Sequence, residues 1–512
     1  MFSEFKNLLR LWRIARILAR HAALFPLEEA GVAPVLVVWL KRLLPARKAT
    51  GRPGERLAAA LIALGPSFIK LGQSLAVRSD LIGEEIADDL AALQARMPPF
   101  PAAQAVQTIE DGLGAPIDTL FSEFETEPVA AASIAQVHFA RTMEGDAVAV
   151  KVLRPGIEER FQEDLALFFW LARRIEAVQP KLRRFHPVAV VQTFAETVAN
   201  ELDLRMEAAA AAEFAAQSQD EPLFHVPRVD WTRTSRRVLT LERVEGIPIS
   251  DSARIREAGL DTQDLLARSA ASFFNQAFEH GFFHADMHPG NMFVGEDGSL
   301  LPVDFGIMGR LDRKTRHYLA DMLVGFLDGD YRRVAAVHFE AGYVPGTQSR
   351  EAFAQACRAI GEPIHGRPMN EISLAKLLAQ LFEVTERFQM ETQPQLLLLQ
   401  KTMLVSEGVG RRLDPDTNMW LLARPLIEDW MRANRGPEAR LREAAAELAD
   451  LARKLPALSS LVDRLSETVT ADGLRLHPDT VEGLKGSSQG GGGRGWLLLT
   501  AAALGLIIGL LL

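Results

Sequence analysis

The spacing of apolar residues changes along the chain, and these changes predict the order of its elements. Apolar residues recur at helical spacing through most of residues 30–125, and the stretch MPPFP at 97–101 interrupts them. Residues 137–140 and 147–153 are β-like, and the turn MEGD between them predicts a hairpin. We therefore expect a helical N-terminal region that leads into a sheet.

Helical and strand-like patterns alternate after the hairpin. Two helices are predicted at 165–178 and 189–217, followed by a strand at 236–244, a helix at 264–279 and a strand at 299–309. A long helical region at 312–475 comes last. A turn at 245–248 is expected to close the third strand. Strands and helices in this order are typical of an α+β fold with two lobes.

The C-terminal end departs from the pattern of a soluble protein. Residues 496–512 contain no charged side chain, and at about 1.5 Å per residue they cross most of a bilayer core of about 30 Å. A linker at 476–495 precedes them and ends in the tether GSSQGGGGRG, with Arg494 at the expected membrane edge. We predict a single transmembrane anchor with the body on the cytoplasmic side.

The N-terminal segment, residues 1–29, predicts an amphipathic helix. Its charges are interspersed with apolar residues, so it is not a signal peptide. Its basic side chains share one helical face and its apolar side chains are expected opposite: Lys6, Arg10, Arg13 and Arg20 against Phe5, Leu9, Trp12 and Leu24. This pattern fits equally a helix in an anionic membrane surface and a helix docked on the body.

Composition narrows the class of protein. The chain has 512 residues, 48% hydrophobic and 24% charged, which fits a globular protein with two or three packed regions. A net charge of −9 argues against nucleic acid as a partner. One cysteine, Cys357, excludes an intramolecular disulfide framework and a cysteine-based zinc cluster, and favours a reducing compartment.

The stretch HGFFHADMHPGNMFV allows two interpretations. Histidines recur there every four residues, a spacing that puts metal ligands on one face of a continuous helix. The Pro-Gly pair breaks any such helix, so His280, His284 and His288 need not converge. The more informative spacing is that of Asp286 and Asn291, and we expect His284 to hold their loop in place.

Three separated pieces suit phosphoryl transfer. Lys151 ends an apolar strand, where its ammonium can pair with nucleotide phosphates. Asp286 can position or deprotonate a nucleophile, and Asn291 offers an amide oxygen to a magnesium ion. Asp304 in VDFG is a hard carboxylate ligand at a strand end. A strand lysine, D-x-x-x-x-N and D-F-G follow one another in the order found in protein kinases.

These pieces and their neighbours resemble the UbiB family of atypical kinase-like proteins, which support ubiquinone biosynthesis. The motifs span residues 68–306 and are FIKLGQ, AAASIAQVH, AVKVLRPG, NELDLRMEA, HADMHPGN and VDFG. The resemblance implies an atypical protein-kinase-like, two-lobed α+β fold with a helix laid across the nucleotide cleft. The expected division begins with an amphipathic helix at 1–29, a helical K-x-G-Q extension at 30–125 and an N-lobe at 126–247. A C-lobe with a helical extension at 248–475, a linker at 476–495 and a transmembrane anchor at 496–512 follow.

The resemblance also implies roles for individual residues. Lys151 would contact the α- and β-phosphates of ATP, and Asp286 would fill the catalytic-aspartate position. Asn291 and Asp304 would hold Mg²⁺. The segment that replaces the glycine-rich loop is Ala130, Ala131, Ala132, Ser133, Ile134, Ala135, Gln136, Val137 and His138. The hinge backbone that meets adenine would run from Glu242 through Val244 to Glu245.

Further family motifs lie outside the catalytic loop. They are Lys70, Gly72 and Gln73 of K-x-G-Q and Glu201 and Asp203 of E-x-D. Lys70 and Gln73 are expected to face the E-x-D element, where their helix would restrict access for a bulky protein. Lys151 is expected to pair with either Glu196 or Glu201, both on the helix predicted over 189–217.

The chain also departs from ordinary protein kinases. Ala130 to Ala132 carry Cβ atoms that disfavour the positive φ open to a glycine-rich loop. Position 285 is alanine where the usual catalytic loop has an arginine, and no A-P-E follows VDFG. These departures count against an open groove for a protein substrate.

The expected protein is a membrane-anchored kinase or ATPase that uses ATP and Mg²⁺ and supports ubiquinone biosynthesis, including its ring-hydroxylation steps, at the bacterial inner membrane. Expected partners are membrane lipid and either lipid-like ubiquinone precursors or ubiquinone-biosynthesis enzymes, and a homodimer is left open. The alternatives are a true protein kinase that regulates those enzymes and a pseudokinase scaffold. A hydroxylase fits less well, because the chain has no Rossmann glycine fingerprint and no cysteine ligand set. The phosphoryl acceptor is left open between water, lipid and protein.

Overall fold

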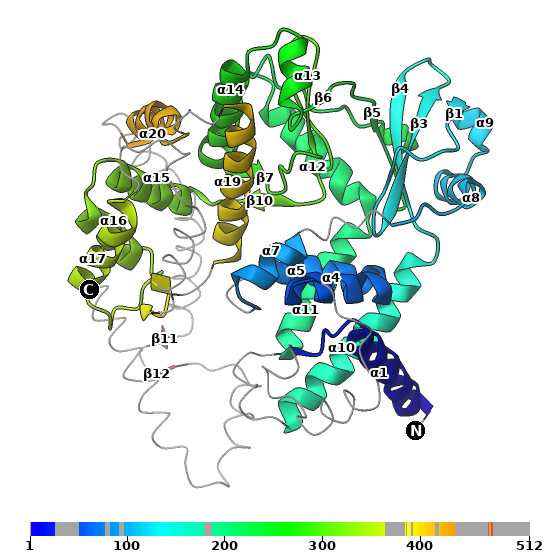
Figure 1. The fold of residues 1–512 in the computed structure, drawn as a ribbon, viewed down its shortest axis with the longest axis horizontal. Helices are drawn as coiled ribbons and strands as arrows, with labels where there is room; N and C mark the ends of the chain where they lie inside the picture. The colour runs from blue at the N-terminus through cyan, green and yellow to red at the C-terminus, as the bar shows by residue number, and fades with distance from the viewer. Residues whose placement is uncertain are drawn as a thin grey trace. The chain divides into compact units, whose positions relative to one another are not determined.

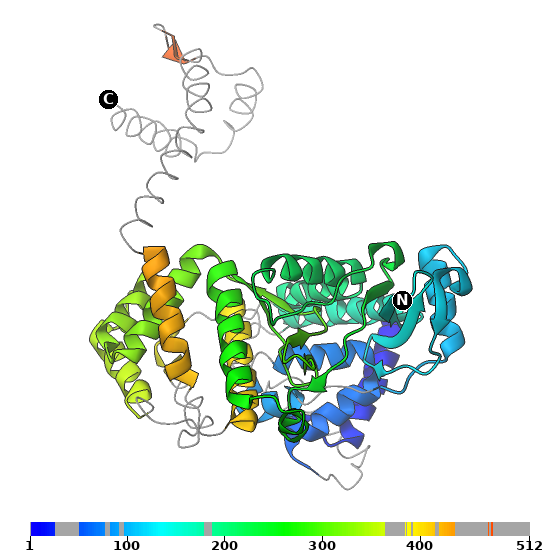
Figure 2. The ribbon, with the colours of Figure 1, turned by 90° about the horizontal axis from the view of Figure 1, so that it is seen from above.

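The computed structural model describes two compact units, Met1–Trp430 and Met431–Leu512. The residues that it describes are 2–25, 51–76, 82–91, 97–178, 187–363, 384–385, 387–390, 393–414, 419–435, 469–470 and 473–474. In the second unit two short strands, β11 (Val469–Thr470) and β12 (Gly473–Leu474), pair antiparallel. Figures 1 and 2 show the elements from two sides.

The N-terminal region is mainly helical, as predicted, in the part that the structure describes. Its helices are α1 (Phe2–Arg20), α4 (Pro53–Leu64), α5 (Pro66–Ala76), α7 (Glu84–Ala91), α8 (Ala102–Leu113) and α9 (Ile117–Leu120). Helices α4, α5 and α7 pack on one another around Leu57, Leu61, Phe68 and Leu90. Helix α5 also crosses the long helices α10 (Ile157–Val178) and α11 (Pro187–Glu201) (Figure 1).

Helix α1 docks on the body through one side and exposes the other. Arg10 forms a 2.6 Å ion pair with Asp164 of α10, so the docked interpretation is correct for this side. Its exposed large apolar side chains are Phe5, Leu9 and Trp12, at 64%, 55% and 46% exposure. They lie on the same outward side as the exposed Lys6, Arg13, Arg16 and Arg20, so the predicted placement on opposite faces is wrong. The helix ends at Arg20, and Leu24 beyond it is buried.

A five-stranded antiparallel sheet follows. Its strands are β1 (Phe121–Phe124), β2 (Ala130–Ala131), β3 (Ala135–Thr142), β4 (Ala147–Leu153) and β5 (Val238–Glu242), in the order β1-β3-β4-β5 with β2 on β3. The predicted β3–β4 hairpin is confirmed, and its register places Val137 opposite Lys151. Strand β1 lies where helix was expected, because a four-residue strand is too short to show a period.

One predicted helix is in fact two. The apolar pattern over 189–217 continues without interruption, but α11 ends at Glu201 and α12 (Leu204–Gln217) begins after Asp203. The Asp203 side chain accepts a hydrogen bond from the backbone N–H of Arg205, which caps the new helix. The two helices therefore have independent directions, and the residues of E-x-D lie at the break between them.

The C-lobe surrounds the loop 285–291 with short strands and helices. Its elements are β6 (Ile247–Pro248), α13 (Ser252–Glu257), α14 (Thr262–Phe274), the π-helix η3 (Asn275–His280), β7 (Phe282–His284), β8 (Met292–Val294), β9 (Leu300–Pro302) and β10 (Met308–Arg310). The 3-10 helix η2 (Trp231–Arg233) belongs instead to the N-lobe, where it contacts β5. The strand order is β6-β8-β9, and β7 pairs with β10. Ile247 and Pro248, predicted as turn, therefore belong to a strand.

The region predicted to be helical over 312–475 is mainly helical where the structure describes it, but the short strands β11 and β12 also lie in this range. Its helices are α15 (Arg313–Leu327), α16 (Tyr331–Glu340), α17 (Arg350–Gly361), α19 (Pro394–Leu413) and α20 (Met419–Arg435). Helices α15, α16 and α17 pack side by side (Figures 1 and 2). Helix α19 contacts α14 and β10, and its Val409 and Leu413 join the buried cluster around the catalytic loop.

The predicted membrane anchor falls on residues without a description. Residues 476–495 and 496–512 lie outside the described part of the chain. Among the described residues, no helix combines the length and the apolar character needed to cross a bilayer.

Candidate functional site

Lys151 on β4 is the centre of a three-residue ion-pair group. Its Nζ donates to both carboxylate oxygens of Glu207 on α12, at 2.8 and 2.9 Å. It also donates to Oδ1 of Asp304, at 3.0 Å. The predicted partners Glu196 and Glu201 are both wrong, because the helix break after Glu201 makes α12 the helix that reaches the lysine.

Burial and mutual attraction set the charges of this group. Burial opposes the charge on Lys151, but the carboxylates of Asp304 and Glu207 raise its pKa overall. Lys151 holds the pKa of Asp304 well below its usual range. Burial raises the pKa of Glu207 to about 7, although Lys151 opposes the rise. At neutral pH the lysine and Asp304 are therefore charged, whereas Glu207 titrates.

Asp304 follows β9 in a backbone conformation that is uncommon for residues other than glycine. Its φ is +64°, in the left-handed region that few residues other than glycine adopt. The backbone N–H of Val303 donates to the C=O of Asn291 at 2.8 Å, which ties this turn to the catalytic loop. Such a conformation persists where the surroundings fix it, and here it presents the carboxylate to Lys151.

Residues 285–291 form a loop between β7 and β8, and His284 holds it. Nδ1 of the buried His284 accepts from the backbone N–H of Asp286 at 3.2 Å, and Nε2 lies 3.3 Å from the C=O of Val303. Burial lowers the pKa of His284, so the neutral ring accepts at one nitrogen and donates at the other. The structural role expected for this histidine agrees with these contacts.

The three histidines of this stretch do not form a metal site. His280 ends the π-helix, and His284 uses both ring nitrogens within its own loop. Nδ1 of His288 accepts from the backbone N–H of Gly290 at 3.0 Å. Within the described ranges, no group of three or more His, Cys, Asp or Glu side chains is arranged to hold a metal.

The predicted magnesium ligands have suitable donor atoms. The amide nitrogen of Asn291 donates to the backbone C=O of Asp286 at 3.1 Å, which leaves the amide oxygen as the atom for a cation. Asp304 supplies an ionised carboxylate on the adjoining turn. Mg²⁺ is typically bound by one or two carboxylates or amides together with phosphate oxygens and water. The two residues therefore fit a magnesium ion that is bound with a nucleotide.

Asp286 has a partner from a distant part of the chain. Its Oδ1 accepts from Nζ of Lys401 on α19, at 2.8 Å, and its Oδ2 lies 3.7 Å from Nε2 of His288. Both members of the Asp286–Lys401 pair are partly exposed. The candidate site is thus assembled from the sheet, from α12, from two C-lobe loops and from the C-terminal helical region.

Backbone pairing with β3 and the side chain of Arg154 hold the alanine-rich segment. Ala130 and Ala131 pair with β3, and the guanidinium of Arg154 donates to the C=O of Ala132 at 2.9 and 3.1 Å. The same guanidinium donates to the C=O of Pro98 at 3.0 Å. Arg154 therefore links this segment to the loop that precedes α8.

Two residues of the predicted nucleotide-binding segment turn away from Lys151. The Gln136 side chain is buried and hydrogen-bonds the backbone of Phe100. Nδ1 of the buried His138 donates to the C=O of Glu125 at 2.8 Å. Side chains alternate along a strand, so Val137, which pairs with Lys151, is the residue on the lysine's face.

Helix α5, which carries K-x-G-Q, contacts the E-x-D element through Lys70, as predicted. Nζ of Lys70 lies 2.6 Å from the Glu201 carboxylate, and both side chains are 15% exposed. Gly72 is buried beside them on α5. Asp203 has a different task, since it caps the helix that carries Glu207. The E-x-D element therefore links the Lys70 contact to the Lys151 contact.

The predicted hinge is the connection between β5 and β6. The carboxylate of Glu242 is turned toward His225 and Arg228, at 3.1 and 3.2 Å. The backbone of Val244 lies in this connection, between two strands that belong to different sheets. Its contact with adenine stays a prediction.

Comparison with known proteins decides the family. Residues 92–338 match the ABC1 atypical kinase-like domain, and residues 357–418 match the UbiB helical domain. The chain is 42% identical over 465 residues to the probable protein kinase UbiB of Marinobacter nauticus, which covers 89% of this chain and 84% of that one. The chain belongs to the UbiB family. A UbiB relative from Pseudomonas paraeruginosa is also 42% identical, over 470 residues, or 90% of this chain and 88% of that one.

A solved structure supports the kinase-like UbiB fold. The complex of Rv3197 with erythromycin from Mycobacterium tuberculosis is 25% identical in sequence, with a TM-score of 0.52. The match covers 78% of this chain and 98% of that one. The predicted resemblance and the α+β kinase-like fold are confirmed, and Lys401 lies in the UbiB helical domain.

Sequence reasoning missed two residues of this UbiB site. Glu207 stands inside the quoted motif NELDLRMEA, but the helix break that selects it leaves no mark in the apolar spacing. Lys401 is the one charged residue in the run PQLLLLQKTMLV. A single charge on an apolar helix is a weak signal, and nothing local connects it with Asp286.

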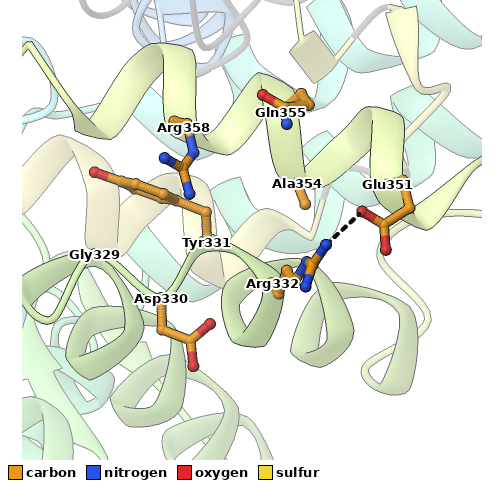
Figure 3. A pocket seen from close by; sticks show the side chains of 8 residues that line it. All are labelled: Gly329, Asp330, Tyr331, Arg332, Glu351, Ala354, Gln355 and Arg358. Atoms are coloured by element: carbon orange, nitrogen blue, oxygen red, sulfur yellow. Dashed lines mark ion pairs between the residues drawn. The ribbon is translucent and has the colours of Figure 1, made fainter.

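A small pocket of about 200 Å³ lies outside this site, between α16 and α17 (Figure 3). Two arginines line it, and both have partners there. Arg332 lies 3.7 Å from Glu351, and Arg358 lies over the Tyr331 ring, 5.2 Å from its centroid. These contacts join the two helices, and we assign no ligand to the pocket.

Proposed function

We propose that the protein binds ATP with Mg²⁺ and acts as an atypical kinase or ATPase that supports ubiquinone biosynthesis, including its ring-hydroxylation steps. The observation that carries the proposal is the pairing of Lys151 with Glu207 beside Asp304. In protein kinases a strand lysine, a helix glutamate and the aspartate of D-F-G act together on nucleotide phosphates and metal. Membership of the UbiB family supports the link to ubiquinone biosynthesis.

Each residue of the site has a task in the proposed reaction. Lys151 contacts the α- and β-phosphates while Glu207 holds its ammonium in place. Asn291 and Asp304 hold Mg²⁺, which when bound neutralises charge on the phosphates. Asp286 orients the acceptor hydroxyl or water and takes its proton as the bond to the γ-phosphorus forms. The bond from the γ-phosphorus to the β,γ-bridging oxygen breaks in the same transfer, and ADP leaves with that oxygen.

The acceptor that we favour is water or a lipid-like ubiquinone precursor. The Lys70–Glu201 pair holds α5 at the E-x-D element, next to the helix that carries Glu207. The missing A-P-E motif also argues against a groove for a folded protein. A true protein kinase that acts on ubiquinone-biosynthesis enzymes is the second candidate, and a pseudokinase scaffold is the third.

Labelled ATP separates these candidates. We would incubate the protein without residues 496–512 with γ-labelled ATP and Mg²⁺, with and without liposomes that contain a phenolic lipid. Label in free phosphate indicates an ATPase, label in lipid a lipid kinase, and label in an added partner enzyme a protein kinase. Binding of ATP without any transfer would indicate a pseudokinase scaffold. Absence of ATP binding would contradict the proposal.

We also propose that the body is held at the cytoplasmic face of the bacterial inner membrane. The uncharged segment 496–512 supports this proposal. Helix α1 supports it independently, because its outward side combines exposed apolar side chains with basic ones. Anionic lipid headgroups attract such a helix while its apolar side chains enter the interface.

Flotation with vesicles tests the contribution of α1. In protein without residues 496–512, we expect the triple change Phe5→Ser, Leu9→Ser and Trp12→Ser to abolish flotation with anionic vesicles. Val190→Ser, at a side chain 54% exposed on α11, is the matched control and should float like the parent. Equal flotation of parent and triple variant would exclude α1 from membrane binding.

A further inference from the structure

We propose that Lys401 is a catalytic residue, supplied by the UbiB helical domain, whose ammonium contacts the γ-phosphate of ATP. This inference rests on the proposed phosphoryl transfer and adds a residue to it. The observation behind it is the 2.8 Å contact between Nζ of Lys401 and Oδ1 of Asp286. No motif of the kinase-like domain includes this lysine.

The contact puts a positive charge where the reaction takes place. In the proposed reaction Asp286 lies within hydrogen-bond reach of the acceptor atom, and the acceptor attacks the γ-phosphorus. A cation that touches the same carboxylate therefore lies beside the group that is transferred. The Lys401 side chain is 31% exposed, so its ammonium can exchange the carboxylate for a phosphate oxygen with little change in position.

The rest of the site leaves room for such a cation. Lys151 is held by Glu207 and Asp304 at the other end of the site. Within the loop 285–291, position 285 is alanine, and Nδ1 of His288 accepts a hydrogen bond from the backbone N–H of Gly290. Charge on transferring phosphoryl oxygens is commonly stabilised by lysine, arginine or metal. Lys401, which contacts Asp286, is a basic side chain whose position suits the γ-phosphate.

Helix α19 is a firm support for this lysine. Val409 and Leu413 of α19 belong to the same buried cluster as Met287, Met292 and Phe305, which flank the catalytic loop and the D-F-G turn. The helix also contacts α14 and β10. Catalytic side chains work best on elements that packing fixes, and α19 is fixed against the loop that it serves.

The main test compares ATP with ADP, which lacks the γ-phosphate. We expect Lys401→Met to weaken ATP binding roughly 10-fold, as loss of a charge-assisted hydrogen bond does, and to leave ADP binding unchanged. Turnover should fall about 100-fold, as on loss of one donor to a transition-state oxyanion. Lys401→Arg should recover most of both. Arg412→Met removes an exposed basic residue from the same helix and should behave like the parent.

A second comparison separates a phosphate contact from an effect through Asp286. In an Asp286→Asn background, Lys401→Met should still weaken ATP binding relative to ADP binding. If it adds nothing there, or if it weakens ATP and ADP equally, the lysine only supports the loop and the proposal fails. Faster turnover of Lys401→Met would overturn it as well, because the ion pair would then be inhibitory.

The outcomes keep this proposal distinct from the proposed function. Thermal unfolding of each variant shows that it is folded before nucleotide is added. A parent protein that binds and turns over ATP, together with an unchanged Lys401→Met, overturns the role of Lys401 alone. A parent protein that binds no ATP overturns the proposed function and the role of Lys401 with it.

Discussion

The two ends of the site are built differently. At the nucleotide end, Lys151 and Glu207 are 18% and 8% exposed, and the lysine contacts two carboxylates. At the acceptor end, Asp286 and Lys401 are 24% and 31% exposed and share one contact. A buried pair gives a fixed geometry at a cost in desolvation, whereas an open pair can exchange partners. The first end is suited to hold phosphates and the second to meet an acceptor.

The largest expected effect comes from a substitution at the acceptor end alone. Asp286→Asn should lower turnover about 1000-fold, because general-base catalysis contributes roughly 100- to 10,000-fold. Nucleotide affinity, measured by calorimetry, should stay near that of the parent protein. Equal losses in affinity and turnover would mean that the two ends are not separate.

The next largest effect is expected from a substitution at the nucleotide end. Asp304→Asn should weaken Mg²⁺-dependent ATP binding about 100-fold, because a neutral amide is a poorer magnesium ligand than a carboxylate. Glu296→Gln, at an exposed acid in the turn between β8 and β9, serves as the control. Unchanged binding of ATP with Mg²⁺ by Asp304→Asn would exclude the metal role.

A third test uses the titration of Glu207. Its folded pKa of about 7 lies above the ordinary value of 4.5, so the folded state holds a proton that the unfolded state has lost between these pH values. Glu207 therefore lowers the free energy of unfolding by about 1.4 kcal/mol per pH unit as pH rises through this window.

Glu207→Gln should remove that slope. Urea unfolding at pH 5.5 and 7.5 measures it. The control is Glu213→Gln, on the same helix as Glu207, which removes an exposed ion pair with Arg310 of β10. This variant should keep the slope of the parent protein. A slope that survives in Glu207→Gln belongs to another group.

The smallest expected effect concerns α5. Lys70→Met leaves Glu201 without its lysine and should lower the free energy of unfolding by about 1 kcal/mol, because the carboxylate, which is 15% exposed, loses its charged partner. Lys70→Arg should retain most of the parent's stability. If both variants match the parent in chemical denaturation, the Lys70–Glu201 contact adds nothing measurable to the fold.

The sequence predicted the parts of the site that lie within one motif. The strand that carries Lys151, the loop with Asp286 and Asn291 and the turn at Asp304 each have a local signature, and each lies where expected. The hairpin followed from alternating residues and the turn between them. Family motifs added the contact between Lys70 and Glu201.

Partners that depend on tertiary packing could not be predicted. The apolar spacing is the same on both sides of Asp203, so one helix was expected and the wrong glutamates were assigned to Lys151. Lys401 meets Asp286 only because α19 packs on the C-lobe core, which no local pattern encodes. Strand β1 was missed because it is too short for its alternation to stand out.

The break between α11 and α12 has a mechanical consequence. Glu201, held by Lys70, is the last residue of α11, and Glu207, held by Lys151, lies in the first turn of α12. Asp203, which caps α12, lies between them in the sequence. The Lys70–Glu201 and Lys151–Glu207 pairs therefore restrain two successive helices from the two sides of one capped break.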